Sequence, residues 1–219
     1  MTGGRPWRPK PAERARVGRI WETLAELYPD ARTELEYRNA FELLCAVMLS
    51  AQCTDVRVNL VTPGLFARFP DADSLARAEV AEVADLIRSC GLWPAKSRNL
   101  VGMARQLLER HDGAVPRRRE DLEALPGVGR KTANVVLAQA FDQPALAVDT
   151  HVFRVARRLG LSRASDVRGV EEDLGRRLAP ECWAEGHHWL ILHGRRVCMS
   201  RRPRCAICPL RGDCPGAEA

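Results

Sequence analysis

Apolar residues recur at the spacing of an α-helix along nearly the whole sequence, and no stretch alternates convincingly with a period of two. Residues 41–49, 132–141 and 150–159 are among the expected helices, and proline or glycine residues punctuate the segments between such helices. The pattern predicts an all-α protein in which short loops connect the helices.

The 219 residues are enough for one large core or two modest ones. Residues 33–144 are expected to form one domain. The cysteine-rich C-terminus needs support, and we expect the first helix to return and pack against it. That places residues 17–32 and 145–219 in a second, discontinuous domain. Residues 1–16 are rich in Pro, Gly and Arg, which predicts a flexible basic tail.

A formal net charge of +6 and an isoelectric point near 9.1 suit a polyanionic partner, although charge alone does not identify nucleic acid. No secretory signal opens the sequence, and its longest apolar runs are too short to span a bilayer. The protein is therefore expected in the reducing cytoplasm, where clustered cysteines more often bind metal than form disulfides.

The stretch Leu125-Pro126-Gly127-Val128-Gly129-Arg130-Lys131-Thr132 carries the strongest local signal. Its proline fixes a turn, and its two glycines let a ligand approach the main chain before a helix whose N-terminal amides attract phosphate. A helix-hairpin-helix near residues 119–138 would grip a DNA backbone without reading sequence. On the glycines alone, an ordinary turn between two helices explains the stretch equally well.

Only three of the 34 basic Lys and Arg residues are lysines: Lys10, Lys96 and Lys131. Arginine serves where only charge is needed, but its delocalised guanidinium cannot act as an amine nucleophile. The helix start, Arg130 and partial burial are all expected to lower the pKa of Lys131. A lysine at such a position can instead bind phosphate, but the scarcity of lysine favours a catalytic role.

Asp149 follows an apolar segment at the start of an expected helix, where aspartate is a preferred N-cap. Capping and catalysis are compatible, because a cap holds the carboxylate rigidly. A carboxylate near Lys131 could accept the proton of the amine and stabilise positive charge on a sugar.

Four cysteines near the C-terminus have the spacing Cys-x6-Cys-x2-Cys-x5-Cys. Zinc ribbons usually have two close cysteine pairs, whereas only one pair is present here, so a structural [4Fe–4S] cluster is favoured over zinc. The arginines between the first two ligands can press on phosphates or simply face solvent. The expected ligands are Cys198, Cys205, Cys208 and Cys214, and the arginines are Arg201, Arg202 and Arg204. Packing roles are expected for Cys45, Cys53, Cys90 and Cys182.

Together these pieces resemble the endonuclease III family of DNA glycosylase/AP lyases, over about residues 17–215. The resemblance implies two helical domains with a DNA-binding cleft between them. One is a six-helix barrel with the helix-hairpin-helix, and the other is an iron–sulfur cluster domain. The matching motifs are the hairpin through Ala133-Asn134, Val148-Asp149-Thr150-His151, the cysteine spacing, Leu49-Ser50-Ala51-Gln52 and Gly91-Leu92.

The resemblance implies excision of oxidised pyrimidines from duplex DNA, followed by nicking 3′ to the abasic site through a Schiff base on Lys131. Asp149 would assist the amine, and Gln52 would fill the gap left by the flipped nucleotide. Leu92 would wedge into the stack opposite, and His151 would lie beside the lesion pocket. DNA-backbone contacts are expected from Gly127, Val128, Gly129 and Arg130.

The same resemblance implies a monomer near the nucleoid of a bacterial-type cell, without a membrane partner. Cys53 and Trp93-Pro94 depart from the family pattern beside the expected DNA-probing loops, which leaves the lesion preference open. Three alternatives compete: an adenine glycosylase, a thymine-mismatch glycosylase, and a non-enzymatic DNA-binding redox sensor. Lys131 together with Asp149 separates the enzyme from the sensor.

Overall fold

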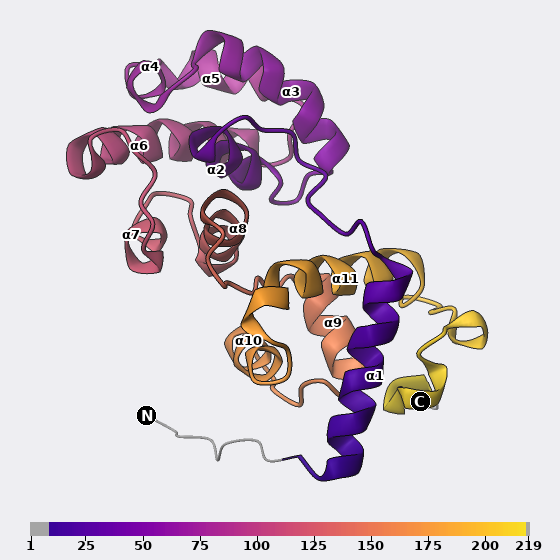
Figure 1. Cartoon of the computed structure of the whole chain (residues 1–219). Coiled ribbons are helices and arrows are strands. Elements are labelled where there is room, and N and C mark those ends of the chain that lie inside the picture. The colour runs from indigo at the N-terminus through magenta and orange to yellow at the C-terminus, as the bar shows by residue number, and fades with distance from the viewer. Residues whose placement is uncertain (1–8, 218–219) are drawn as a thin grey trace. The chain divides into compact units, whose positions relative to one another are not determined.

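The computed structural model describes residues 9–217, which are helical and contain no β-strand. This confirms the all-α prediction. The chain divides into two compact units (Figure 1). Residues 33–143 form the first, called here the hairpin unit, while residues up to 32 and from 144 onward form the second, the cysteine unit. No helix among the described residues is long and apolar enough to cross a membrane.

Helix α2 is the centre of the hairpin unit, and every residue after its first is buried. It packs against α8, α3 and α6. Asn39 caps its start by accepting a hydrogen bond from the amide of Glu42. The bounds are α2 (Ala40–Leu49), α3 (Asp55–Arg68), α4 (Ala72–Ala76), α5 (Val80–Leu86), α6 (Trp93–His111), α7 (Arg119–Glu123) and α8 (Arg130–Phe141).

The cysteine unit combines the N-terminal helix with the C-terminal third of the chain. Helices α1 and α9 both pack against α11, and Leu24, Val152 and Leu190 are fully buried among them. The bounds are α1 (Pro11–Leu27), α9 (Thr150–Arg158), α10 (Val167–Gly175) and α11 (Trp183–Arg196). Short 3₁₀ turns follow at Cys205–Ile207, Arg211–Asp213 and Pro215–Ala217.

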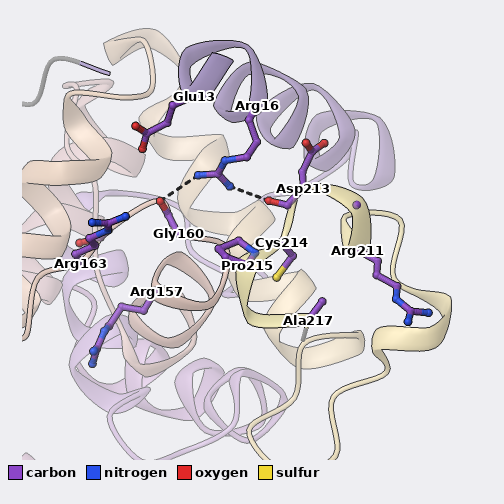
Figure 2. Close-up of a pocket in the computed structure, with 12 residues that line it drawn as sticks. Glu13, Arg16, Arg157, Gly160, Arg163, Arg211, Asp213, Cys214, Pro215 and Ala217 are labelled. Carbon is purple, nitrogen blue, oxygen red and sulfur yellow. Dashed lines mark hydrogen bonds between the residues drawn. The ribbon is translucent and has the colours of Figure 1, made fainter. Parts of the chain in front are cut away.

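The predicted tail over residues 1–16 requires a correction. Residues 1–8 lie outside the described residues, but α1 already begins at Pro11, because proline is well suited to the first turn of a helix. Arg16 is part of that helix and donates hydrogen bonds of 2.8 Å to the carbonyl oxygens of both Leu159 and Asp213. Figure 2 shows the bond to Asp213 and a further one to the carbonyl oxygen of Gly160. Residues 11–16 therefore belong to the folded cysteine unit.

Candidate active site and cysteine site

The hairpin between α7 and α8 is shaped by two glycines. Gly127 has a φ of 77°, and a Cβ there would lie 2.7 Å from the side-chain nitrogen of Asn99, so only glycine fits. Gly129 is the N-cap of α8 and has open space around its Cα. The buried Val128 between them donates its amide to the carbonyl of Leu125 at 3.1 Å and anchors the turn. The exposed glycine edge can therefore approach a phosphate backbone.

Lys131 lies in the first turn of α8 and is partly exposed. Its neighbour Arg130 places a guanidinium nitrogen 3.7 Å from a carboxylate oxygen of Glu123. That ion pair offsets part of the positive field that Arg130 was expected to exert on the lysine. On the buried side of α8, Asn134 accepts a 2.9 Å hydrogen bond from Arg119, which fixes α7 against α8.

The other two lysines are placed differently. Lys96 is buried, its ammonium donates a 2.7 Å hydrogen bond to the carbonyl of Leu49, and burial lowers its pKa. This contact ties the first turn of α6 to the C-terminal end of α2. Lys10 is exposed and precedes α1 in the cysteine unit. Lys131 is thus the lysine that the hairpin presents.

Asp149 is the N-cap of α9, as its sequence context predicts, and accepts a 2.8 Å hydrogen bond from the amide of Val152. The segment leading to it, residues 145–148, is buried. His187 donates from Nδ1 to the carbonyl of Ala147 at 2.7 Å, which secures that segment. The half-buried carboxylate is consequently held by both the cap and the backbone before it.

His151 lies in the first turn of α9 and is half-buried. Arg154 can only donate, so its 3.2 Å contact makes Nδ1 of His151 the acceptor and leaves the ring proton on Nε2. Arg154 also donates to the carbonyls of Gly194 and Cys198. One arginine therefore orients the histidine and holds the first expected metal ligand.

Gln52 and Leu92 occupy adjoining loops of the hairpin unit. Both are exposed and both have left-handed backbone, with φ values of 51° and 59°. A Cβ at Gly91 would lie 2.8 Å from the carbonyl oxygen of Gln52, so the two loops touch through their main chains. A non-glycine residue in this conformation costs about 1–3 kcal/mol, and such strain clusters at functional sites.

The structure thus brings the hairpin residues, Lys131, Gln52 and Leu92 into the hairpin unit. It brings Asp149, His151 and the four expected metal ligands into the cysteine unit.

The four cysteines Cys198, Cys205, Cys208 and Cys214 are all half-buried and line one cavity. Burial raises the pKa of both Cys208 and Cys214, and the charges of the other cysteines raise it further. Such crowding of thiols favours a bound cation that would hold them as thiolates. Among residues 9–217, no group of three or more Cys, His, Asp or Glu is arranged around a single metal ion, so the support for a metal centre is the cavity that the four cysteines share.

Nitrogen donors surround these thiols. Arg158 donates to the sulfur of Cys198 at 3.6 Å, and Nε2 of His193 lies 3.7 Å from the sulfur of Cys208. Burial lowers the pKa of His193 to about 4, so the ring is neutral, and Tyr28 contacts its Nδ1 at 3.2 Å. Four cysteines with nearby N–H donors fit a thiolate-bound metal centre better than a disulfide pair.

Sequence reasoning missed the arginines that support this site. Arg158 donates to the carbonyls of Met199 and Ser200 and so fixes the start of the loop toward Cys205. The signal that could have found it is its position four residues after Arg154 on the helix that Asp149 caps, since residues so spaced share one face. Arg201, Arg202 and Arg204 on that loop are exposed.

A cavity of about 860 Å³ in the cysteine unit lies beside the contacts of Arg16 (Figure 2). Of the predicted site residues it contains Cys214 alone. Arg157, Arg163 and Arg211 also line it, whereas the predicted catalytic residues do not. The cavity is thus a feature of the junction between α1 and the C-terminal turns.

Comparison with known proteins identifies the family. Residues 45–180 match the family of HhH-GPD superfamily base excision DNA repair proteins. Endonuclease III of Synechocystis sp. is 46% identical over 209 residues, which cover 95% of each chain.

Two solved structures extend the comparison. A trapped endonuclease III–DNA covalent intermediate matches with a TM-score of 0.90 and 44% identity, covering 94% of this chain and 97% of that one. A thermostable thymine-DNA glycosylase matches with a TM-score of 0.84 but 23% identity, covering 94% and 99%, and so shares the fold alone. The chain therefore belongs to the endonuclease III family and is a DNA glycosylase and AP lyase of base excision repair.

Proposed function

We propose that Lys131 is the nucleophile with which this enzyme removes oxidised pyrimidines from duplex DNA and then nicks the strand by β-elimination. The observation that carries the proposal is a partly exposed lysine in the first turn of α8, directly after the glycine hairpin. A DNA covalent intermediate has been trapped in a solved structure of the same family. Of the other lysines, Lys96 is buried against a carbonyl and Lys10 precedes a helix of the other unit.

In the proposed reaction, the Lys131 amine attacks C1′ of the damaged nucleotide, and the bond from C1′ to the base breaks. The sugar ring opens to a Schiff base on Lys131, loss of a C2′ proton follows, and the bond to the 3′ phosphate oxygen breaks. Asp149 accepts the proton of the amine and stabilises positive charge on the sugar. Its cap hydrogen bond with Val152 keeps the carboxylate rigid for this role.

The remaining predicted residues would hold and open the DNA. The hairpin glycines and Arg130 approach the phosphate backbone, which fixes position without reading sequence. Gln52 and Leu92 fill the space that a flipped nucleotide leaves in the stack, and His151 lies at the lesion pocket. Their exposure and left-handed backbone support this role for Gln52 and Leu92.

Cys198, Cys205, Cys208 and Cys214 would hold a [4Fe–4S] cluster. Its chemistry here is structural, since it would pin the loop that carries Arg201, Arg202 and Arg204 where that loop can meet phosphates. The support is the shared cavity of the four cysteines and the N–H donors of Arg158 and His193. We expect purified protein to be brown and to contain iron and sulfide, and stoichiometric zinc after anaerobic purification would contradict the assignment.

Borohydride trapping on duplex DNA with a thymine-glycol lesion tests the nucleophile. Wild-type protein should form a covalent complex, and Lys131→Gln should lower trapping by about 10³-fold or more. Lys10→Gln is the matched control and should trap like wild type. Trapping that survives Lys131→Gln would assign the nucleophile to another group.

Asp149→Asn tests the proposed proton acceptor without removing the cap, because asparagine and aspartate are equally good N-caps. Base release should slow by about 10²–10⁴-fold, as for loss of a positioned acid or base, while thermal stability stays near wild type. An equal loss of stability and of activity would indicate that the residue is only a cap.

A further inference from the structure

We propose that Cys53 and Cys90 form a hydroperoxide-sensitive thiol pair, and that their oxidation to a disulfide fastens the Gln52 loop to the Leu92 loop. The sequence pattern predicts only packing roles for both cysteines. They lie 37 positions apart in the sequence, on the two adjoining loops, each within two residues of a proposed DNA-probing side chain.

The two loops already meet at this point. The amide of Cys53 donates to the carbonyl of Ser50 at 3.1 Å, and that of Cys90 donates to the carbonyl of Ile87 at 2.8 Å. These turns hold each cysteine in place, and Cys53 lies close enough to Cys90 to raise the pKa of its thiol. The backbones also touch here, since a Cβ at Gly91 would lie 2.8 Å from the carbonyl oxygen of Gln52, so the loops that carry the two cysteines are direct neighbours.

The two thiols differ in exposure, which assigns their roles. Cys53 is half-buried, whereas Cys90 is 1% exposed. Burial, and then the neighbouring Cys53, raise the pKa of Cys90 to about 11. The charges of Lys96 and Arg57 act in the opposite direction on the pKa of Cys90, but more weakly. Cys53 is therefore the thiol that meets an oxidant, and Cys90 is the thiol that resolves it.

The chemistry balances with one hydroperoxide. The Cys53 thiolate attacks one peroxide oxygen, the O–O bond breaks, and the released hydroxide takes a proton to become water. The Cys90 thiol then loses its proton and attacks the sulfur of the Cys53 sulfenic acid, which expels a second hydroxide that leaves as water. Two thiols and one hydrogen peroxide thus give one disulfide and two waters.

Formation of the disulfide would disturb the Gln52 loop and the Leu92 loop. A disulfide holds its sulfurs about 2.05 Å apart, which is closer than two unbonded thiols can approach. A Cβ at Gly91 would already clash with the carbonyl of Gln52, so the backbones have little room to approach. Oxidation is therefore expected to displace Gln52 and Leu92 and to weaken binding of lesion DNA, a consequence that rests on the proposed function of those two residues.

Peptide mapping of the holoenzyme tests the thiol pair itself. After limited hydrogen peroxide, digestion without reductant should give a peptide that links Cys53 to Cys90, two hydrogens lighter than the reduced pair. Dithiothreitol should remove the link, and Cys53→Ser and Cys90→Ser should each lack it. A link to a C-terminal cysteine, or Cys53 sulfinic acid beside a reduced Cys90, would overturn the proposal.

DNA binding tests the consequence separately. Peroxide should weaken binding of the wild-type holoenzyme to a duplex with an abasic-site analogue by about tenfold, and dithiothreitol should restore it. The double variant Cys53→Ser, Cys90→Ser should show no such change, and equal iron content in all samples excludes cluster damage. If the linked peptide forms while affinity stays constant, the effect on Gln52 and Leu92 is refuted and the thiol pair stands.

Discussion

The hairpin unit and the C-terminal end of the cysteine unit are stabilised in different ways. In the hairpin unit, α2 is buried along nearly its whole length. At the end of the cysteine unit, Leu210 is the one buried residue within positions 198–217, all of which the structure describes. This segment is instead tied by arginines that donate to carbonyl oxygens and by four cysteines around one cavity. Helix α2 thus relies on apolar burial, whereas the C-terminal end of the cysteine unit, beyond the apolar core around Leu24, Val152 and Leu190, relies on polar contacts and an expected metal centre.

Removal of the proposed iron–sulfur cluster should give the clearest difference between the two units. We expect residues 198–217 to lose their amide protection, because so few apolar contacts hold them, while α2 and α8 keep theirs. Hydrogen exchange followed by mass spectrometry measures both units in one sample. Equal loss of protection in both units would show that they depend on the metal centre alike.

A substitution that creates a cavity beside α2 should have the next largest effect, in this case on the stability of the protein. Leu44 is fully buried, so Leu44→Ala should destabilise the protein by about 2–5 kcal/mol in urea unfolding. Leu60 on α3 is 67% exposed, and Leu60→Ala should change stability by less than about 0.5 kcal/mol. Similar losses for both variants would contradict the burial of α2 as the source of stability.

Loss of one arginine should affect the cysteine unit locally. Arg158→Met leaves the carbonyls of Met199 and Ser200 without this donor, and because both groups can reach water the loss should be about 0.5–1.5 kcal/mol per hydrogen bond. Iron should be released faster from this variant, while exchange in α2 is unchanged. Arg168→Met is the control, since Arg168 is exposed and 3.5 Å from Glu172. The prediction is wrong if both variants release iron at the same rate.

The ion pair between Arg19 and Asp213 should have the smallest effect. Its 2.6 Å contact lowers the pKa of Asp213, chiefly through the hydrogen bond from Arg19. A lowered pKa means that the contribution is present above the ordinary carboxyl pKa of about 3.9 and is lost as pH falls through the folded value. Asp213→Asn should therefore lower the Tm slightly at pH 7 and not at strongly acid pH. A difference that grows toward acid pH would reverse this sign.

Short-range features of the fold could be predicted from the sequence. The apolar spacing predicts helices, the preference of aspartate for N-caps predicts the role of Asp149 at the start of α9, and the Pro-Gly-x-Gly stretch predicts the hairpin. Each of these depends on neighbours within a few residues. The Pro- and Arg-rich composition of residues 11–16 was misleading, because Arg16 contacts Asp213 at the other end of the chain.

The long-range contacts could not be predicted. Lys96 and Leu49 are separated by 47 positions, and no local pattern indicates that an ammonium will meet that carbonyl. The approach of Gly91 to the carbonyl of Gln52 depends in the same way on two loops that become neighbours only in the folded unit. Packing decides these contacts, whereas periodicity and capping record only local preference.

The discontinuous cysteine unit has a consequence for the order in which the parts of the protein can fold during synthesis. Residues 33–143 leave the ribosome as one continuous stretch and can fold before synthesis ends. Helix α1 is synthesised first, but its buried face packs on α11, which begins at Trp183. Helix α1 can therefore bury this face only after α11 has been synthesised.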